Sequence, residues 1–126
     1  MKEIWIVDDD EEMTKAMQLM LKLLGYETAC YLSPRPAAKA LLSNQRPDLL
    51  LLDINMPGGV SGLDMLEFVR RRADLKNLPV VMLSTEAADV TVDRAMELGA
   101  DTYVSKPVTI EELEAALELA FQKHPR

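Results

Sequence analysis

The sequence of 126 residues is poor in the features that mark a secreted or membrane-bound protein. It contains one cysteine, Cys30, so no disulfide can form within the chain, and a lone thiol is typical of a reducing compartment. The longest apolar run is LLLL at residues 49–52, far short of the roughly 18 residues that cross a membrane. The first residues, MKEIW, lack the apolar segment of a signal peptide. We therefore expect a cytoplasmic protein without membrane contact.

Positive charge is also scarce. The chain has 14 Lys and Arg against 21 Asp and Glu, which gives a net charge of −7, so direct nucleic-acid binding by this chain is not expected. Hydrophobic residues make up 48% and charged residues 28%, a balance typical of folded globular proteins. The length is that of one domain, and we expect residues 1–126 to form a single one.

Strand-like and helix-like segments alternate along the chain. Short β-branched or apolar runs predict strands, and apolar residues at three- and four-residue steps predict amphipathic helices. Residues 48–54, DLLLLDI, are continuously apolar between acids, as in a parallel strand covered on both faces. The predicted strands are 3–7, 27–31, 48–54, 79–84 and 102–105, and the predicted helices are 11–24, 34–42, 63–72, 87–98 and 110–121. Five such units with short connections predict an α/β fold, a doubly wound five-stranded parallel sheet.

Several residues at the predicted helix ends have local roles. Ser33 before Pro34 is expected to be an N-cap, and Thr109 with Glu112 forms a capping box. The acids at 10–12 are expected to complement the positive end of a helix. The run at 70–72, RRR, and His124 are expected to be solvated.

Chemically active side chains follow the predicted strands. Asp8 and Asp9 end the first strand, Asp53 the third and Ser84 the fourth, and Lys106 comes directly after the fifth. Ligands of doubly wound folds bind beyond the carboxyl ends of the strands. Carboxylates with open positions suit Mg²⁺, and a lysine there suits a phosphoryl oxygen. The sequence therefore predicts a magnesium and phosphate site at that edge.

Four segments together resemble the receiver domain of bacterial two-component response regulators. They are IVDDD, LLLDINMP, VVMLSTE and GADTYVSKP, and they cover essentially the whole chain in the family's order and spacing. The resemblance implies the flavodoxin-like strand order 2-1-3-4-5. It also implies a signalling switch, with self-phosphorylation and self-dephosphorylation as its only chemistry.

The resemblance assigns roles at the strand ends. Asp53 is implied to accept a phosphoryl group from a phosphohistidine and become a phosphoaspartate. Asp9 and Asp53 are implied to bind Mg²⁺ directly and Asp8 through water, with the backbone carbonyl of Asn55 as a further ligand, and Mn²⁺ is expected to substitute. Lys106 is implied to pair with Asp53 and then with the phosphoryl group.

The resemblance also implies a switch. Ser84 would move toward the phosphoryl group, with Thr85 as the alternative, and Tyr103 would turn from an exposed to a buried rotamer. The surface of the fourth helix, fifth strand and fifth helix would change in response. Asn55 and Glu86 are expected to tune the lifetime of the phosphate, and we expect that lifetime to be short.

The implied partners are a sensor histidine kinase or a histidine phosphotransfer protein, and a downstream output domain or protein. One alternative is a Mg²⁺-dependent phosphohydrolase with an aspartyl-phosphate intermediate, but such enzymes typically need D-x-D, and position 55 is Asn. A second alternative, a flavin-binding electron carrier, is disfavoured because the acids after the first strand would repel the flavin phosphate.

Overall fold

The structure is a computed structural model that describes residues 2–54, 56, 61–85 and 90–124. Strands and helices alternate along the chain, as the sequence predicts. The strands are β1 (Glu3–Val7), β2 (Glu27–Tyr31), β3 (Leu49–Asp53), β4 (Val80–Ser84) and β5 (Thr102–Ser105). The helices are α1 (Glu11–Leu23), α2 (Pro34–Leu42), α3 (Gly62–Arg71), α4 (Val90–Glu97) and α5 (Ile110–Lys123).

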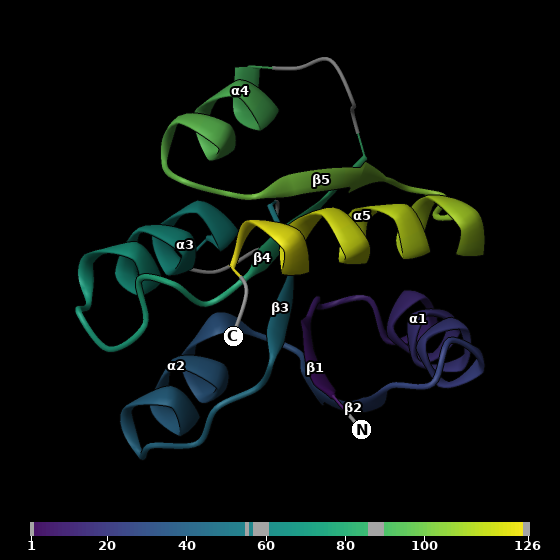
Figure 1. The fold of residues 1–126 in the computed structure, drawn as a ribbon, viewed down its shortest axis with the longest axis horizontal. Helices are drawn as coiled ribbons and strands as arrows, with labels where there is room; N and C mark the ends of the chain where they lie inside the picture. Colours follow the sequence, from purple (N-terminus) through teal and green to yellow (C-terminus); the bar gives the residue numbers. More distant parts are fainter. Residues whose placement is uncertain (1, 55, 57–60, 86–89, 125–126) are drawn as a thin grey trace.

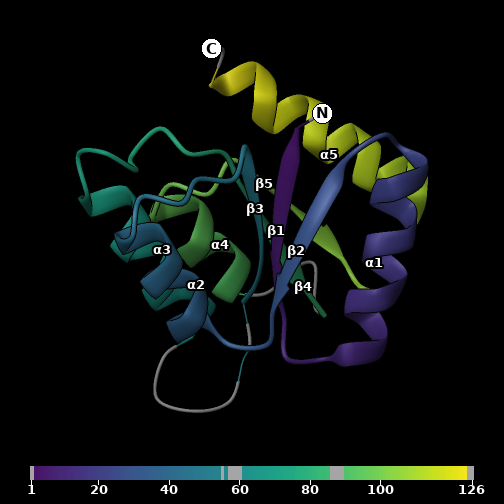
Figure 2. The ribbon, with the colours of Figure 1, turned by 90° about the horizontal axis from the view of Figure 1, so that it is seen from below.

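The five strands form one parallel sheet in the order β2-β1-β3-β4-β5. Figure 1 shows this sheet within the ring of helices, and Figure 2 shows it nearly edge-on, with α1 and α5 on one face and α2, α3 and α4 on the other. The predicted fold class and strand order are confirmed. Among the described residues, no helix is both long enough and apolar enough to cross a bilayer.

The central strand β3 shows why a continuous apolar run is needed. Leu50 and Leu52 pack into the core beneath α2, α3 and α4, whereas Leu49 and Leu51 pack into the core beneath α1 and α5. All four are fully buried, because both faces of the sheet are covered. The strand ends at Asp53, and Ile54 after it is still buried in the core beneath α2, α3 and α4.

Polar residues precede the first turns of several helices, and most of them cap the helix with a side-chain hydrogen bond. Thr109 accepts a hydrogen bond from the N–H of Glu112, so the predicted cap of α5 is confirmed. Asp10, expected only as an acid at the positive end of a helix, is the N-cap of α1 and accepts a hydrogen bond from the N–H of Met13. Ser33 occupies the N-cap position of α2, as expected, but its side chain makes no capping hydrogen bond. Pro34 has no N–H to be capped and presets the helical φ, so the first turn depends less on a side-chain cap. The first predicted turn of α4, residues 87–89, lies outside the described residues.

A polar cluster at the amino ends of the strands corrects two further predictions. Asp101, directly before β5, is buried and accepts hydrogen bonds from Arg70 (3.2 Å) and the N–H of Val80 (2.8 Å). The Nε2 of His124 lies 2.7 Å from the other carboxylate oxygen of Asp101. Arg70 also donates to the carbonyls of Gly99 and Leu78. Arg70 and His124 are therefore not solvated, because the end of α3 and the end of α5 both pack against this buried acid.

Candidate metal and phosphoryl site

The acidic residues predicted from the sequence gather at the carboxyl edge of the sheet. Asp8 follows β1 and is fully buried, and Asp53 ends β3 with an exposed fraction of 3%. Asp9 is exposed at the rim of the site. One carboxylate oxygen from each of these three residues lies within 4.8 Å of the other two. Residues that are 44 or more positions apart in sequence therefore converge, because β1 and β3 are neighbours and parallel.

Lys106 lies between the two buried carboxylates. Its Nζ is 2.9 Å from Oδ2 of Asp8 and 3.5 Å from Oδ2 of Asp53. The backbone N–H of Lys106 donates to the carbonyl of Ser84 at 2.7 Å, which fixes where the side chain starts. Burial lowers the pKa of Lys106, but the adjacent carboxylates of Asp8 and Asp53 raise that pKa by more, so the net direction is upward. The lysine is therefore held in its charged form.

The two oxygens of Asp8 differ in their partners. Oδ1 accepts a hydrogen bond from the N–H of Asp10 at 3.0 Å. Oδ2 is buried and is held by the ion pair with Lys106 at 2.9 Å, with no further partner among the described residues. A carboxylate oxygen with one ionic partner still has a lone pair for a further ligand.

These residues fit a hard divalent cation. Mg²⁺ and Mn²⁺ prefer oxygen ligands. Oδ2 of Asp8 could therefore bind a cation, or accept a hydrogen bond from a water that the cation holds. The formal charges of three aspartates and one lysine sum to −2, which one divalent ion would balance. The exposed position of Asp9 leaves the site open to solvent and to a second molecule.

Of the predicted switch residues, Ser84 lies at this edge and Tyr103 lies within β5. Ser84 ends β4 and is buried, with an exposed fraction of 1%, whereas Thr85 is exposed. Tyr103 lies on β5, opposite Met82, and is 37% exposed. A groove of about 380 Å³ lies between β5 and α5, lined in part by Tyr103, Ala116 and Leu119. Asn55 and Glu86 lie outside the described residues.

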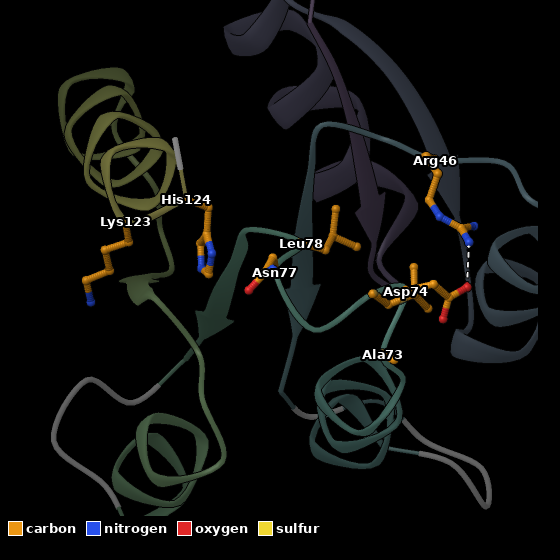
Figure 3. A pocket seen from close by; sticks show the side chains of 8 residues that line it. Arg46, Ala73, Asp74, Asn77, Leu78, Lys123 and His124 are labelled. Atoms are coloured by element: carbon orange, nitrogen blue, oxygen red, sulfur yellow. Dashed lines mark hydrogen bonds and ion pairs between the residues drawn. The ribbon is translucent and has the colours of Figure 1, made fainter. Parts of the chain in front are cut away.

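A second hollow lies at the amino edge, away from the acidic cluster. It has a volume of about 390 Å³ and is lined by Arg46, Asp74, Asn77, His124 and their neighbours (Figure 3). The charged groups there are paired within the protein, Arg46 with Asp74 at 2.8 Å and His124 with Asp101. Sequence reasoning missed Asp101, although an acid directly before a strand was a signal that could have found it.

Comparison with known proteins decides the family. A family model described as the response regulator receiver domain matches residues 4–118. This chain belongs to the response regulator receiver domain family. The family serves two-component signalling, in which receiver domains work with histidine kinases and output domains.

Solved structures agree with this assignment. The receiver domain is 29% identical to a putative response regulator from Chloroflexus aurantiacus J-10-fl, with a TM-score of 0.89 over 96% of this chain and 98% of that chain. It is 29% identical to a chemotaxis protein of Vibrio cholerae, with a TM-score of 0.83 over 94% of this chain and 97% of that chain. It is 28% identical to the signal receiver domain of a histidine kinase from Syntrophus aciditrophicus, with a TM-score of 0.87 over 100% of this chain and 94% of that chain.

Proposed function

We propose that residues 1–126 act as a single cytoplasmic receiver domain in which Asp53 accepts a phosphoryl group from a histidine kinase or a histidine phosphotransfer protein, in a Mg²⁺-dependent reaction. The observation that carries this proposal is the convergence of carboxylate oxygens of Asp8, Asp9 and Asp53 within 4.8 Å of one another. Family membership supports the signalling role. A downstream output domain or protein then responds to the phosphorylated state.

The acceptor chemistry follows from the position of Asp53. A carboxylate oxygen of Asp53 attacks phosphorus, a new P–O bond forms, and the P–N bond of the phosphohistidine breaks with its electron pair returning to the imidazole nitrogen. Asp8, Asp9 and Asp53, with the backbone carbonyl of Asn55, would hold Mg²⁺. The ion supplies charge neutralisation between two anionic reactants. Lys106, 3.5 Å from Asp53, pairs with a phosphoryl oxygen after transfer.

The response to phosphorylation spreads from the carboxyl edge to the surface formed by α4, β5 and α5. The phosphoryl group brings about −1.5 to −2 charges and three acceptor oxygens. The Ser84 hydroxyl donates to one of these oxygens, and Tyr103 turns inward from its half-exposed position. Asn55 and Glu86 tune the lifetime of the phosphate. The protein acts as a switch and does not turn over a separate substrate.

The test is the mass of the protein after incubation with acetyl phosphate and Mg²⁺. The wild type should gain one phosphoryl group, and Asp53→Ala should gain none because the nucleophile is absent. Asp74→Ala is the matched control, because Asp74 is an exposed acid at the opposite edge, and it should be phosphorylated like the wild type.

Two results would contradict the proposal. One is equal phosphorylation of the wild type and Asp53→Ala, which would place the acceptor elsewhere. The other is catalytic turnover of a generic phosphomonoester, which would favour the phosphohydrolase alternative.

A further inference from the structure

The first turn of α3 lies directly against the backbone of Asp53. Gly62 is the first residue of α3, and its N–H points to the carbonyl of Ile54 at an N–O distance of 3.3 Å. A Cβ atom on Gly62 would lie 1.9 Å from the carbonyl oxygen of Asp53, 2.8 Å from its carbonyl carbon and 3.0 Å from Cα of Ile54. Gly62 has no left-handed φ, so the requirement for glycine here is steric.

The strand side of this contact is held firmly. The three atoms that a Cβ would meet belong to the backbone, so no side-chain rotation relieves the overlap. Asp53 lies opposite Leu83 in the β3–β4 register, and the N–H of Ile54 donates to the carbonyl of Leu83 at 3.0 Å. Asp53 therefore cannot shift without disturbing β4.

The helix side is held as well. Ser61 and Asp64 form a capping box, in which the N–H of Asp64 donates to the Ser61 hydroxyl at 3.2 Å and the N–H of Ser61 donates to the Asp64 carboxylate at 3.0 Å. Met65 and Leu66 anchor the same turn in the buried core that contains Ile54. A side chain at position 62 would have to separate α3 and Asp53 by about 1 Å or more to reach ordinary contact.

We propose that Gly62 is a positioning residue for the phosphoryl acceptor. Its missing side chain lets α3 press against the Asp53 backbone, and this contact keeps the Asp53 carboxylate close to Asp8, Asp9 and Lys106. The inference rests on the proposed function, since it concerns the placement of the acceptor. It predicts that enlarging residue 62 damages metal binding and phosphoryl acceptance beyond any loss of stability.

The test compares Gly62→Ala with Gly25→Ala. Gly25 has a φ of +93° and open space around it, so alanine there strains the backbone at about 1 kcal/mol without touching the acidic edge. At saturating Mg²⁺, Gly62→Ala should lower the maximal rate of phosphorylation by acetyl phosphate by about tenfold or more. Its Mg²⁺ affinity, measured by calorimetry, should also fall, whereas Gly25→Ala should match the wild type in both measurements.

A second variant covers the case in which Gly62→Ala does not fold. Ser61→Ala removes the cap and adds no atoms near Asp53, at a cost of about 1 kcal/mol in stability. It should weaken Mg²⁺ binding about threefold, since the helix turn that braces Asp53 is loosened.

The outcomes separate the two proposals. Wild-type rate and Mg²⁺ affinity in folded Gly62→Ala, or in Ser61→Ala if the first variant does not fold, overturn the role of Gly62. A wild-type protein that is not phosphorylated contradicts the proposed function instead, and the Mg²⁺ affinities still decide whether Gly62 positions the acidic edge.

Discussion

Two buried aspartates at opposite edges of the sheet differ in how their oxygens are satisfied. Asp101, at the amino edge, uses both oxygens: one faces His124 at 2.7 Å, and the other accepts from Arg70 and from the N–H of Val80. Asp8, at the carboxyl edge, is also buried, yet its Oδ2 has only the ion pair with Lys106 at 2.9 Å and no further partner among the described residues.

The difference separates an acid that ties elements together from an acid at the proposed metal site. A buried carboxylate with complete hydrogen bonding ties elements together, and Asp101 ties α3, β4 and α5. Carboxylates that crowd together with incomplete bonding are costly in the empty site and gain energy when a cation enters. Removing charge at the two edges should therefore change stability in opposite directions.

The largest effect is expected at the amino edge. Asp101→Ala removes the carboxylate partner of Arg70 and His124 and the acceptor of the Val80 N–H, so the free energy of unfolding should fall by about 3–5 kcal/mol in urea denaturation. Asp74→Ala removes an exposed acid that also pairs with arginine, and it should change the free energy of unfolding far less, because solvent screens that pair. A similar fall in the free energy of unfolding in Asp101→Ala and Asp74→Ala would show that the buried ion pairs of Asp101 are no stronger than the exposed ones of Asp74.

An intermediate effect is expected for Lys106→Met without Mg²⁺. The change leaves Asp8 and Asp53 facing each other with no cation between them, so the free energy of unfolding should fall by about 2 kcal/mol. Saturating Mg²⁺ should recover much of this loss, because an ion that binds only the folded state stabilises it. A loss that Mg²⁺ does not reduce would argue against a shared metal site.

The pH dependence supplies the control for Lys106. Its pKa in the folded protein is raised above the ordinary value of 10.5, so its stabilising contribution is complete below 10.5 and is lost as the pH rises through the folded value. The stability difference between the wild type and Lys106→Met should therefore be constant near neutral pH and shrink in strong alkali. A stability difference between the two proteins that grows as the pH rises would contradict a raised pKa for Lys106.

The smallest effect is expected for Asp8→Asn, and it is stabilising. Without Mg²⁺, removal of one negative charge beside Asp9 and Asp53 should raise the free energy of unfolding by about 1 kcal/mol, while Lys106 keeps Asp53 as its partner. With saturating Mg²⁺, the wild type should overtake the variant. Thermal unfolding of both proteins with and without Mg²⁺ measures this crossover, and a destabilised variant in the absence of Mg²⁺ would contradict it.

The sheet and the acidic edge could be predicted because their signals are local. A short, continuously apolar run such as that at Leu49–Asp53 is typical of a central parallel strand, and the side chains of Asp10 and Thr109 mark helix starts because they accept hydrogen bonds from backbone N–H groups. Once the strands are parallel, residues that follow them must share one edge. The meeting of Asp8 and Asp53 also requires β1 and β3 to be neighbours, which the family resemblance implied and the strand pairing shows.

The amino edge could not be predicted in the same way. His124 and Asp101 are 23 positions apart, and Arg70 reaches Gly99 across 29 positions, so both contacts depend on how helices pack. Nothing in the residues next to Arg70 or His124 indicates that either side chain pairs with a buried acid. The need for glycine at position 62 is equally hidden, because it comes from the backbone of a different element.

The most direct test of the account is a titration of the wild-type protein with Mn²⁺, followed by NMR. Paramagnetic broadening should begin at the amide signals of residues 8–10 and 53–54 and should leave those of Val80 and Asp101 sharp until much higher concentrations. Broadening that starts at Asp101, or that spreads evenly over all exposed acids, would contradict the claim that Asp8, Asp9 and Asp53 form one cation site.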